Sequence, residues 1–256
     1  MNTEMKPIVA KIGGGALAGG ALEDLPEILA DSTPVVLVHG GGPQLTRMLD
    51  SLGITTRWHE GLRVTDEATL DVAEMVYAGT VNKALVRELQ ELGVPAAGIS
   101  GTDGPTLLVD PVPELGRVGE VREVETSLIE ALWYGDFVPV LAPLGLGPEG
   151  AYNVNADVAA AALAVGLGAG QLFLMTDVDG LLKDGEPVPE IAPEECEDYV
   201  RDGLAAGGMV PKLRTAARAA QGGVEARIVN GNKKGTLRAA MAGEQVGTII
   251  SEGAVA

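Results

Sequence analysis

The chain is poor in the residue types that would point to several common classes of protein. Only one of its 256 residues is a cysteine, Cys196, so neither an intrachain disulfide nor a cysteine-based metal site can form. Glu194 and Glu195 precede this cysteine and would raise the pKa of its thiol, which predicts a structural rather than a reactive side chain. Aromatic residues make up 3% of the chain, so its core must be built from alanine, valine and leucine.

Basic residues and long apolar runs are scarce as well. The 18 lysines and arginines stand against 36 acidic residues, which gives a net charge of -18. A nucleic-acid binder needs a basic footprint, and an anionic membrane surface would repel this chain, so we expect neither partner. The longest apolar run, 159–170, is shorter than the roughly 20 residues that cross a bilayer, and the polar start "MNTEMKP" does not resemble a signal peptide. We therefore expect a cytoplasmic protein.

Short apolar runs alternate with helical patterns along the chain, which is typical of an α/β fold. Because most of the runs are too apolar to have a wet face, they predict a mainly parallel central sheet covered on both sides, in an open αβα sandwich. Two segments predict hairpins: 55–65, which mixes β-branched, aromatic and charged residues around Gly61, and 105–121, which is punctuated by proline and glycine. A boundary between lobes is expected near 168–171. Strands are predicted at 8–12, 35–39, 96–100, 137–144, 172–177 and 226–231, and helices near 43–52, 66–92, 124–134, 156–166, 193–203 and 211–222.

The stretch "VVLVHGGGPQ" carries the clearest local signal for a ligand. Three glycines follow the strand at 35–39, and Pro43 suits the first turn of a helix. A tight turn from strand to helix needs one or two glycines, whereas three leave bare backbone N–H groups at a helix N-terminus, where they can bind an anion. His39 precedes the glycines, and we expect it to make structural hydrogen bonds rather than to act as a base.

Two familiar nucleotide motifs do not explain the chain. The P-loop pattern is absent. Gly145, Gly147 and Gly150 match the dinucleotide pattern G-x-G-x-x-G, but Glu149 would face the pyrophosphate and the next helix begins later, near Asn155. We therefore reject a dinucleotide site there.

Three charged residues can each be explained either by local structure or by a ligand. Lys11 lies in an apolar strand, so it is either buried against an anion or faces solvent on an edge strand. Lys212 follows Pro211 in the first turn of a helix, where a cation opposes the helix dipole, which suggests an anionic partner. Asp157 opens the alanine-rich helix, where an acidic residue is also favourable by itself.

The motifs "KIGGG", "VHGGGP", "GLRVTD", "AGTVNK", "NVNAD", "TDVDG" and "GGMVPK" occur in this order between about residues 8 and 250, and together they resemble the amino acid kinase family. "GLRVTD" and "NVNAD" are similar to the branch that acts on N-acetyl-L-glutamate. The resemblance implies an αβα sandwich with an N-terminal lobe, 1–170, for acetylglutamate binding and dimerisation. It implies a C-terminal lobe, 171–256, for ATP binding.

The resemblance also implies a role for individual residues. Lys11 and Lys212 would stabilise the transition state, and Asp157 would organise them. The substrate-binding residues would be Gly41 and Gly42 beside the reacting atoms, Arg63 and Asn153 at the α-carboxylate end, and Asn155 nearby; a side chain at Gly41 would then fill the space of the reacting atoms. The hairpin that carries Arg63 would act as a lid. The nucleotide-binding residues would be Gly13, Gly14, Asp177, Val178, Asp179, Gly180, Leu181, Leu182, Leu204, Ala205, Ala206 and Gly208.

The implied reaction transfers a phosphoryl group from ATP to the side-chain carboxylate of N-acetyl-L-glutamate, giving N-acetylglutamyl 5-phosphate for arginine biosynthesis. A carboxylate, with a pKa of about 4.3, is already ionised at neutral pH, so no general base is needed. The demand is for positioning and positive charge, which suits lysines and backbone amides. We expect Mg²⁺ to arrive with ATP, bridging its phosphates, without a dedicated protein cage.

Two other functions fit parts of the sequence. A kinase for aminoadipate or glutamate linked to an acidic carrier protein should have a basic surface, which the charge of -18 disfavours. A non-catalytic sensor on the same fold would not need Lys11, Asp157 and Lys212. Arginine-regulated hexamers of the family carry an additional N-terminal helix, and a first strand near residue 8 leaves no room for it, so we expect a feedback-insensitive homodimer with 66–92 as its contact face.

Overall fold

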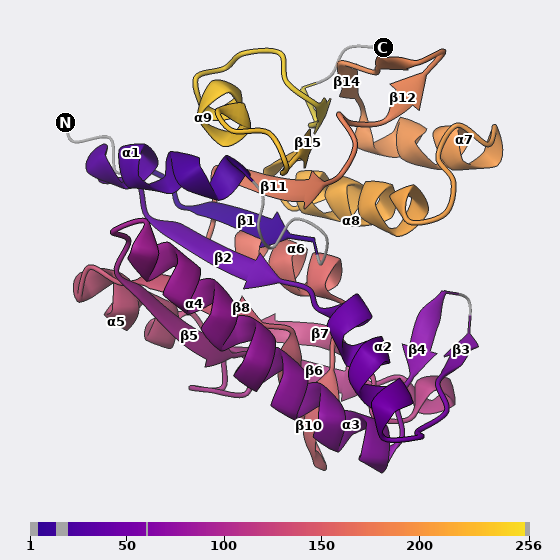
Figure 1. Cartoon of the computed structure of the whole chain (residues 1–256). Coiled ribbons are helices and arrows are strands. Elements are labelled where there is room, and N and C mark those ends of the chain that lie inside the picture. Colours follow the sequence, from indigo (N-terminus) through magenta and orange to yellow (C-terminus); the bar gives the residue numbers. More distant parts are fainter. Residues whose placement is uncertain (1–4, 14–19, 60, 254–256) are drawn as a thin grey trace. The chain divides into compact units, whose positions relative to one another are not determined.

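The computed structural model describes residues 5–13, 20–59 and 61–253 (Figure 1). The chain packs as two compact units. One, which we call the terminal unit, combines Met1–Val35 with Leu163–Ala256, and the other, the central unit, comprises Val36–Ala162. The lobes expected from the sequence concern which ligand each part binds and remain a prediction, whereas these units are defined by packing.

The terminal unit is built on a mixed sheet with the strand order β14-β16-β15-β11-β1. Strand β1 is parallel to β11, and β11 is parallel to β15, so the carboxyl ends of these three strands lie at one edge. The strands of the unit are β1 (Ile8–Ile12), β11 (Gln171–Thr176), β12 (Leu182–Lys183), β13 (Glu186–Pro187), β14 (Glu190–Ile191), β15 (Glu225–Asn230) and β16 (Thr248–Ile250). Its helices are η1 (Gly20–Asp24), α1 (Leu25–Ala30), η4 (Pro193–Glu195), α7 (Cys196–Arg201), α8 (Met209–Gln221) and α9 (Thr236–Met241).

The central unit contains three parallel strands in the order β2-β8-β5 and a separate four-stranded sheet in the order β10-β9-β6-β7. Its strands are β2 (Val35–His39), β3 (Arg57–His59), β4 (Leu62–Val64), β5 (Ala96–Ser100), β6 (Leu107–Pro111), β7 (Gly119–Val124), β8 (Val138–Ala142), β9 (Leu144–Gly147) and β10 (Gly150–Asn153). Its helices are α2 (Gly42–Ser51), α3 (Glu67–Glu74), the π-helix η2 (Met75–Val81), α4 (Asn82–Glu91), η3 (Pro113–Leu115), α5 (Ser127–Tyr134) and α6 (Ala156–Gly166).

The predicted α/β class and mainly parallel sheet are confirmed. The strands β1, β2 and β8 are buried at every residue, as expected for runs without a wet face. Both predicted hairpins form, as the antiparallel pairs β3–β4 and β6–β7. Gly147 pairs with Gly150 across the hairpin β9–β10, so the apparent dinucleotide motif belongs to a turn between strands.

The structure differs from the predicted elements in three respects. The single helix predicted over 66–92 is interrupted by the π-turn of η2, and the apolar run 137–144 continues into a second strand, β9. The short helices η1, α1, η3 and α9 and the strands β10, β12, β13, β14 and β16 were not predicted. Each of these elements is six residues or shorter, which is too short for a periodic pattern to stand out.

The core is as poor in aromatic rings as the composition predicts. Of the two phenylalanines, Phe173 is fully buried in β11 whereas Phe137 is 45% exposed. Cys196 is buried, and burial together with the neighbouring Glu195 raises the pKa of its thiol to about 12. The prediction that this cysteine is structural is therefore confirmed.

A single buried carboxylate joins the beginning of the terminal unit to its end. Asp24, at the end of η1, is 5% exposed and accepts hydrogen bonds from the backbone N–H groups of Gly235 (2.8 Å), Leu237 (3.0 Å) and Arg238 (3.3 Å). These N–H groups belong to the first turn of α9. The N-cap residue of this helix is Gly235, which has no side chain to accept their hydrogen bonds. Asp24 thus caps a helix more than 200 residues away, and its charge suits the positive end of the helix dipole.

We expect Asp24→Ala to lower the free energy of unfolding by about 1–3 kcal/mol, because three N–H groups of the first turn of α9, one of them buried, lose their acceptor. The measurement is the urea midpoint and slope of the wild type and the variant. Asp31→Ala is the matched control, since Asp31 is exposed in the same unit. Equal midpoints for the two variants would mean that the cap does not stabilise the fold.

Candidate active site

The glycine loop between β2 and α2 forms the first part of the site. Helix α2 begins at Gly42, and Pro43 is its second residue. The backbone N–H groups of its first turn therefore lie next to the carboxyl end of the buried strand β2. A side chain on Gly41 would collide with the buried ring of Tyr77, since its Cβ would lie 2.9 Å from two ring carbons. A Cβ on Gly42 would meet no atom within 4 Å. Packing therefore accounts for the glycine at 41, and open space lies beside Gly42.

His39, directly before this loop, is fully buried and hydrogen-bonded through both ring nitrogens. The amide nitrogen of Asn82 donates to Nε2 (3.1 Å), which leaves the proton on Nδ1, and Nδ1 donates to the carbonyl oxygen of Gly40 (2.7 Å). The same amide group of Asn82 also donates to the carbonyl oxygen of Val140 in β8 (2.9 Å). The ring therefore orients the first glycine of the loop, as expected for a structural histidine, and is not placed to act as a base.

Arg63 in β4 is the principal buried charge of the site. Its side chain is 6% exposed, and its two terminal nitrogens donate to the hydroxyl groups of Thr56 (2.8 Å) and Thr46 (2.7 Å). Its guanidinium lies 4.6 Å from the ring centroid of Trp58, its cross-strand neighbour, which screens it from solvent. The hydroxyl of Thr46 in turn donates to the carbonyl oxygen of Gly42 (3.0 Å), so Arg63 is linked to the glycine loop.

The surroundings of Arg63 suit an anion. Burial lowers the pKa of Arg63, while Tyr77 and Asp50 act in the opposite direction. Within residues 5–13, 20–59 and 61–253, no carboxylate forms an ion pair with this guanidinium, in contrast to Arg117, which pairs with Glu67 at 2.6 Å. A buried guanidinium that has only hydroxyl groups and a ring as partners is favourably placed to bind a carboxylate ligand.

The two predicted asparagines occupy different positions in the central unit. Asn153 is half-buried at the end of β10, and its amide nitrogen donates to the hydroxyl of Thr65 (3.1 Å), two residues after Arg63. Asn155 caps α6, since its side-chain oxygen accepts from the N–H groups of Asp157 (2.9 Å) and Val158 (3.2 Å). Asp157, 6% exposed, lies in the first turn of this helix.

In the terminal unit, Lys11 lies at the carboxyl end of β1, opposite Leu174 of β11. Its side chain is 6% exposed, so the alternative of a solvent-facing position on an edge strand is wrong. A Cβ on Gly13 would lie 3.2 Å from the carbonyl oxygen of Met175, which gives this glycine a packing reason in addition to its predicted role. Gly14 lies outside the described residues.

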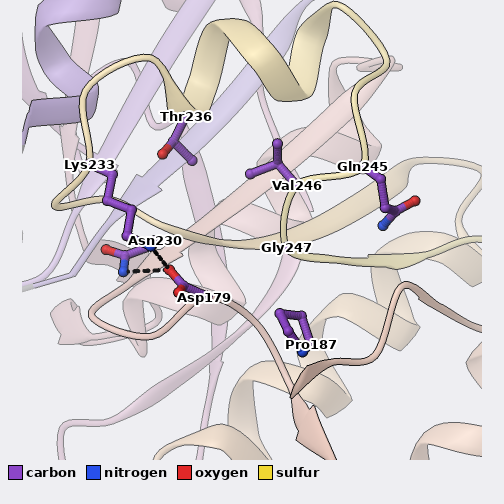
Figure 2. A pocket seen from close by; sticks show the side chains of 8 residues that line it. All are labelled: Asp179, Pro187, Asn230, Lys233, Thr236, Gln245, Val246 and Gly247. Atoms are coloured by element: carbon purple, nitrogen blue, oxygen red, sulfur yellow. Dashed lines mark hydrogen bonds and ion pairs between the residues drawn. The ribbon is translucent and has the colours of Figure 1, made fainter. Parts of the chain in front are cut away.

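The segment 177–182 follows β11 at the same edge of the sheet and is held from two sides. The N–H of Leu181 donates to the buried hydroxyl of Thr248 (2.9 Å), and Gly180 has a φ of 138°, which disfavours other residues. Figure 2 shows Asn230 and Lys233 pointing at the carboxylate of Asp179. Lys233 forms an ion pair with it at 2.7 Å and Asn230 donates a hydrogen bond to it at 2.8 Å, and both interactions lower the pKa of Asp179. These residues line a pocket of about 220 Å³ with Pro187, Thr236, Gln245, Val246 and Gly247.

Helix α8 places Lys212 at this edge as well. The helix packs against β15 and ends at Gln221, four residues before that strand begins, so it runs back along the strand. Thirteen helical residues span about 20 Å, roughly the length of a six-residue strand, and the N-terminus of α8 therefore lies toward the carboxyl end of β15. Lys212 is half-buried in the first turns, and Gly208, the N-cap, has open space beside its Cα.

The loop that precedes α8 carries the predicted residues Leu204, Ala205 and Ala206. The N–H of Ala205 donates to the carbonyl oxygen of Tyr199 in α7 (3.0 Å), and the carbonyl oxygen of Ala206 accepts from the N–H of Met209 (3.1 Å). The loop is thus fixed to both helices of the terminal unit that it connects.

The structure gathers most of the predicted residues into two groups, one in each unit. Gly42, Arg63 and Asn153 are joined through the hydroxyl groups of Thr46 and Thr65, and Gly41 directly precedes Gly42 in the loop. Lys11, Gly13, segment 177–182 and the start of α8 lie at the carboxyl edge of the terminal sheet. Sequence reasoning missed Thr46, Thr56, Trp58, Thr65 and Tyr77, whose types are common in any fold and whose only signal is their place near the quoted motifs.

The described residues contain neither a cluster of metal-binding side chains nor a membrane-spanning helix. No group of three or more histidine, cysteine or acidic side chains there is arranged to hold a metal ion. Among the same residues, no helix combines the length and apolar character that crossing a bilayer requires.

Comparison with known proteins identifies the family. A model of the amino acid kinase family matches residues 6–230. An acetylglutamate kinase of Rubrobacter xylanophilus is 67% identical over 253 residues, which cover 98% of this chain and 100% of that relative, and one of Halalkalibacterium halodurans is 42% identical over 96% of each chain.

Solved structures agree with this assignment. The crystal structure of smu.665 from Streptococcus mutans UA159 has a TM-score of 0.85 at 28% identity and covers 96% of this chain and 98% of its own. Carbamate kinase from Giardia lamblia bound to AMP-PNP has a TM-score of 0.69 at 20% identity, over 97% and 99%, and shares the fold. The chain belongs to the amino acid kinase family.

Proposed function

We propose that this protein is an ATP-dependent kinase that phosphorylates the side-chain carboxylate of N-acetyl-L-glutamate and so makes N-acetylglutamyl 5-phosphate, a step of arginine biosynthesis. The observation that carries the proposal is the buried guanidinium of Arg63, which has hydroxyl partners and no carboxylate partner among the described residues and is linked through Thr46 to the glycine loop. The 67% identity to an acetylglutamate kinase supports the choice of substrate.

In this proposal, the central unit binds the amino-acid substrate. Arg63 binds the α-carboxylate, and Asn153 contributes its remaining amide groups at the same end of the molecule. The backbone N–H groups at Gly41 and Gly42 face the reacting carboxylate, where the positive end of α2 favours negative charge. The open space beside Gly42 is where we place the reacting atoms.

The chemistry asks little of the protein beyond charge and position. One carboxylate oxygen forms a bond to the γ-phosphorus of ATP, the bond from that phosphorus to its bridging oxygen breaks, and ADP leaves with the bonding electrons. No proton moves, because the acceptor is already ionised at neutral pH. We assign Lys11 and Lys212 to neutralising the transferring phosphoryl group, and on the family resemblance we assign Asp157 to organising them.

We place ATP on the terminal unit, at Gly13, Gly14, the segment 177–182, residues 204–206 and Gly208. The support is that the described members of this set lie at or near the carboxyl edge of the terminal sheet, where open α/β folds bind ligands. Mg²⁺ would be held by the nucleotide rather than by a cluster of side chains, and it would lower the charge repulsion between the phosphates and the acceptor.

We further propose a cytoplasmic homodimer whose contact face lies along α3, η2 and α4. The exposed side chain of Met75, 67% accessible in η2, offers apolar surface on that face. The lobes 1–170 and 171–256 describe the proposed division of ligand binding, acetylglutamate and dimerisation on the first and ATP on the second.

A panel of acceptors tests the function. The protein is incubated with Mg-ATP and free N-acetylglutamate, glutamate, aminoadipate or a carrier-linked acid, and the acyl phosphate is trapped with hydroxylamine. We expect the hydroxamate only with free N-acetylglutamate. Turnover of the carrier-linked acid alone would favour the carrier-dependent kinase, and no turnover at all would favour a sensor.

Lys11→Met and Lys212→Met should each lose orders of magnitude in kcat in this assay, whereas Lys183→Met, at an exposed position in β12, should not.

Substitution of Arg63 should act mainly on binding. We expect Arg63→Gln to raise the KM for N-acetylglutamate about 10- to 100-fold, as for the loss of hydrogen bonds to a charged group, and to change kcat much less. Arg57→Gln is the control, because Arg57 is an exposed arginine on the other strand of the same hairpin. A KM for N-acetylglutamate that is the same in both variants would exclude Arg63 from the substrate site.

The two glycines of the loop should respond differently to alanine. Gly42→Ala adds a methyl group in open space, so we expect a free energy of unfolding within about 0.5 kcal/mol of the wild type and a clearly lower kcat/KM. Gly41→Ala should also lower stability, because its Cβ meets the ring of Tyr77. Thermal unfolding and steady-state kinetics of both variants decide this. Full kcat/KM in Gly42→Ala would mean that no ligand approaches that position.

A further inference from the structure

Thr65 lies between the two side chains proposed to hold the substrate's α-carboxylate end. It follows β4 directly, and its side chain is fully buried. Its hydroxyl donates to the carbonyl oxygen of Arg63 (3.3 Å) and accepts from the amide nitrogen of Asn153 (3.1 Å). One hydroxyl therefore connects the hairpin that carries the arginine to the strand that carries the asparagine.

The backbone around Thr65 fixes this arrangement independently of the hydroxyl. The N–H of Thr65 donates to the carbonyl oxygen of Leu115 (2.9 Å), and its own carbonyl oxygen accepts from the N–H of Arg117 (2.6 Å). The carbonyl oxygen of Arg117 accepts from the N–H of Asn153 (2.9 Å). Gly116 completes the close approach, since a Cβ there would lie 2.5 Å from the carbonyl oxygen of Thr65.

The hydroxyl of Thr65 determines the orientation of the Asn153 amide, because it requires the amide nitrogen to face it. A threonine hydroxyl has one proton, and here that proton goes to the carbonyl oxygen of Arg63, so only an N–H of Asn153 can face the hydroxyl oxygen. Among the described residues, the second N–H and the side-chain oxygen of Asn153 have no hydrogen-bond partner, so both can meet a ligand. Without the hydroxyl, the amide could turn over and exchange donor and acceptor at the ligand, which would weaken recognition of a carboxylate.

We propose that Thr65 is a positioning residue for substrate binding, which sets the orientation of the Asn153 amide relative to Arg63. The proposal rests on the proposed function, because it takes the substrate to be an N-acylated amino acid with an α-carboxylate at Arg63. Thr65 itself is fully buried and acts through Asn153.

Thr65→Val isolates this role, because valine has nearly the same shape and keeps both backbone hydrogen bonds. Thr65→Ser restores the hydroxyl. The matched control is Thr106→Val in the same unit: Thr106 is also fully buried, and its hydroxyl donates to the carbonyl oxygen of Asp103 (2.7 Å), in the turn before β6. A loss of stability alone should affect Thr65→Val and Thr106→Val alike.

Binding can be measured without turnover, because Trp58 lies 4.6 Å from the guanidinium of Arg63 and should report on a ligand there. The only other tryptophan, Trp133, is replaced by phenylalanine in all variants so that the fluorescence comes from Trp58. N-acetylglutamate is titrated into each protein, and steady-state kinetics and thermal unfolding are measured in parallel.

We expect Thr65→Val to raise both the Kd and the KM for N-acetylglutamate about 3- to 30-fold, as for one or two lost hydrogen bonds, with kcat and the KM for ATP within about twofold of the wild type. Thr65→Ser and Thr106→Val should match the wild type. In an Asn153→Ala background, Thr65→Val should cause no further loss, since the hydroxyl acts through that amide. Additive losses, or no rescue by serine, would overturn the proposal.

The two proposals fail in different ways. If the wild type turns over free N-acetylglutamate but Thr65→Val binds it as Thr106→Val does, the positioning role is wrong and the function stands. If the wild type does not turn over N-acetylglutamate, the proposed function is wrong. The titrations are then repeated with the acid of the acceptor panel that changes the fluorescence of Trp58. If none of the acids changes that signal, both proposals are overturned.

Discussion

The central unit depends on the burial of one positive charge. The guanidinium of Arg63 is 6% exposed and is satisfied by the hydroxyl groups of Thr46 and Thr56 and the face of Trp58 rather than by an acid. Burying a guanidinium in this way is costly unless an anion completes the site. The contacts of this group link the hairpin β3–β4 to helix α2, both labelled in Figure 1, and through Thr46 to the glycine loop, and we propose that a carboxylate ligand completes the site.

Glycines that look equivalent in "HGGGP" have different physical reasons. The Cβ of any other residue at 41 would collide with the ring of Tyr77, which the π-turn of η2 places against the loop, whereas 42 borders open space. A π-turn inside a helix is an uncommon feature that often accompanies a functional site. Here it places the buried ring of Tyr77 beside the glycine loop. The ring leaves no space for a side chain at Gly41 but does not limit the space beside Gly42.

Neither His39 nor Cys196 is available as a general base, and the carboxylate acceptor that we propose does not need one. His39 has both ring nitrogens engaged with Gly40 and Asn82, and the thiol of Cys196 is kept protonated by burial. The groups to which we assign the reaction are Lys11, Lys212 and the backbone N–H groups at Gly41 and Gly42, with Asp157 organising the lysines. Cations and N–H donors of this kind suit phosphoryl transfer between two anions, because the barrier is largely one of charge and position.

The sequence by itself determined the fold class and both hairpins, because apolar strands and turn residues are local features of a chain. The ligand-binding positions that its motifs indicate remain predictions. It also limited the role of Cys196, through its acidic neighbours. Reasoning from residues alone could not decide between a buried and an exposed Lys11, nor between packing and ligand contact for Gly41.

Only the tertiary structure decided these two questions, and it also brought together side chains that lie far apart in the sequence. Asp24 caps a helix more than 200 residues away, Arg63 meets Thr46 from another element, and Thr65 meets Asn153 across 88 residues. The side chains involved are threonine, aspartate, asparagine and tyrosine, which occur throughout any soluble fold and carry no pattern of their own. Their roles arise from what lies opposite them once distant segments have packed, and a single hydrogen bond has no periodicity from which it could be predicted.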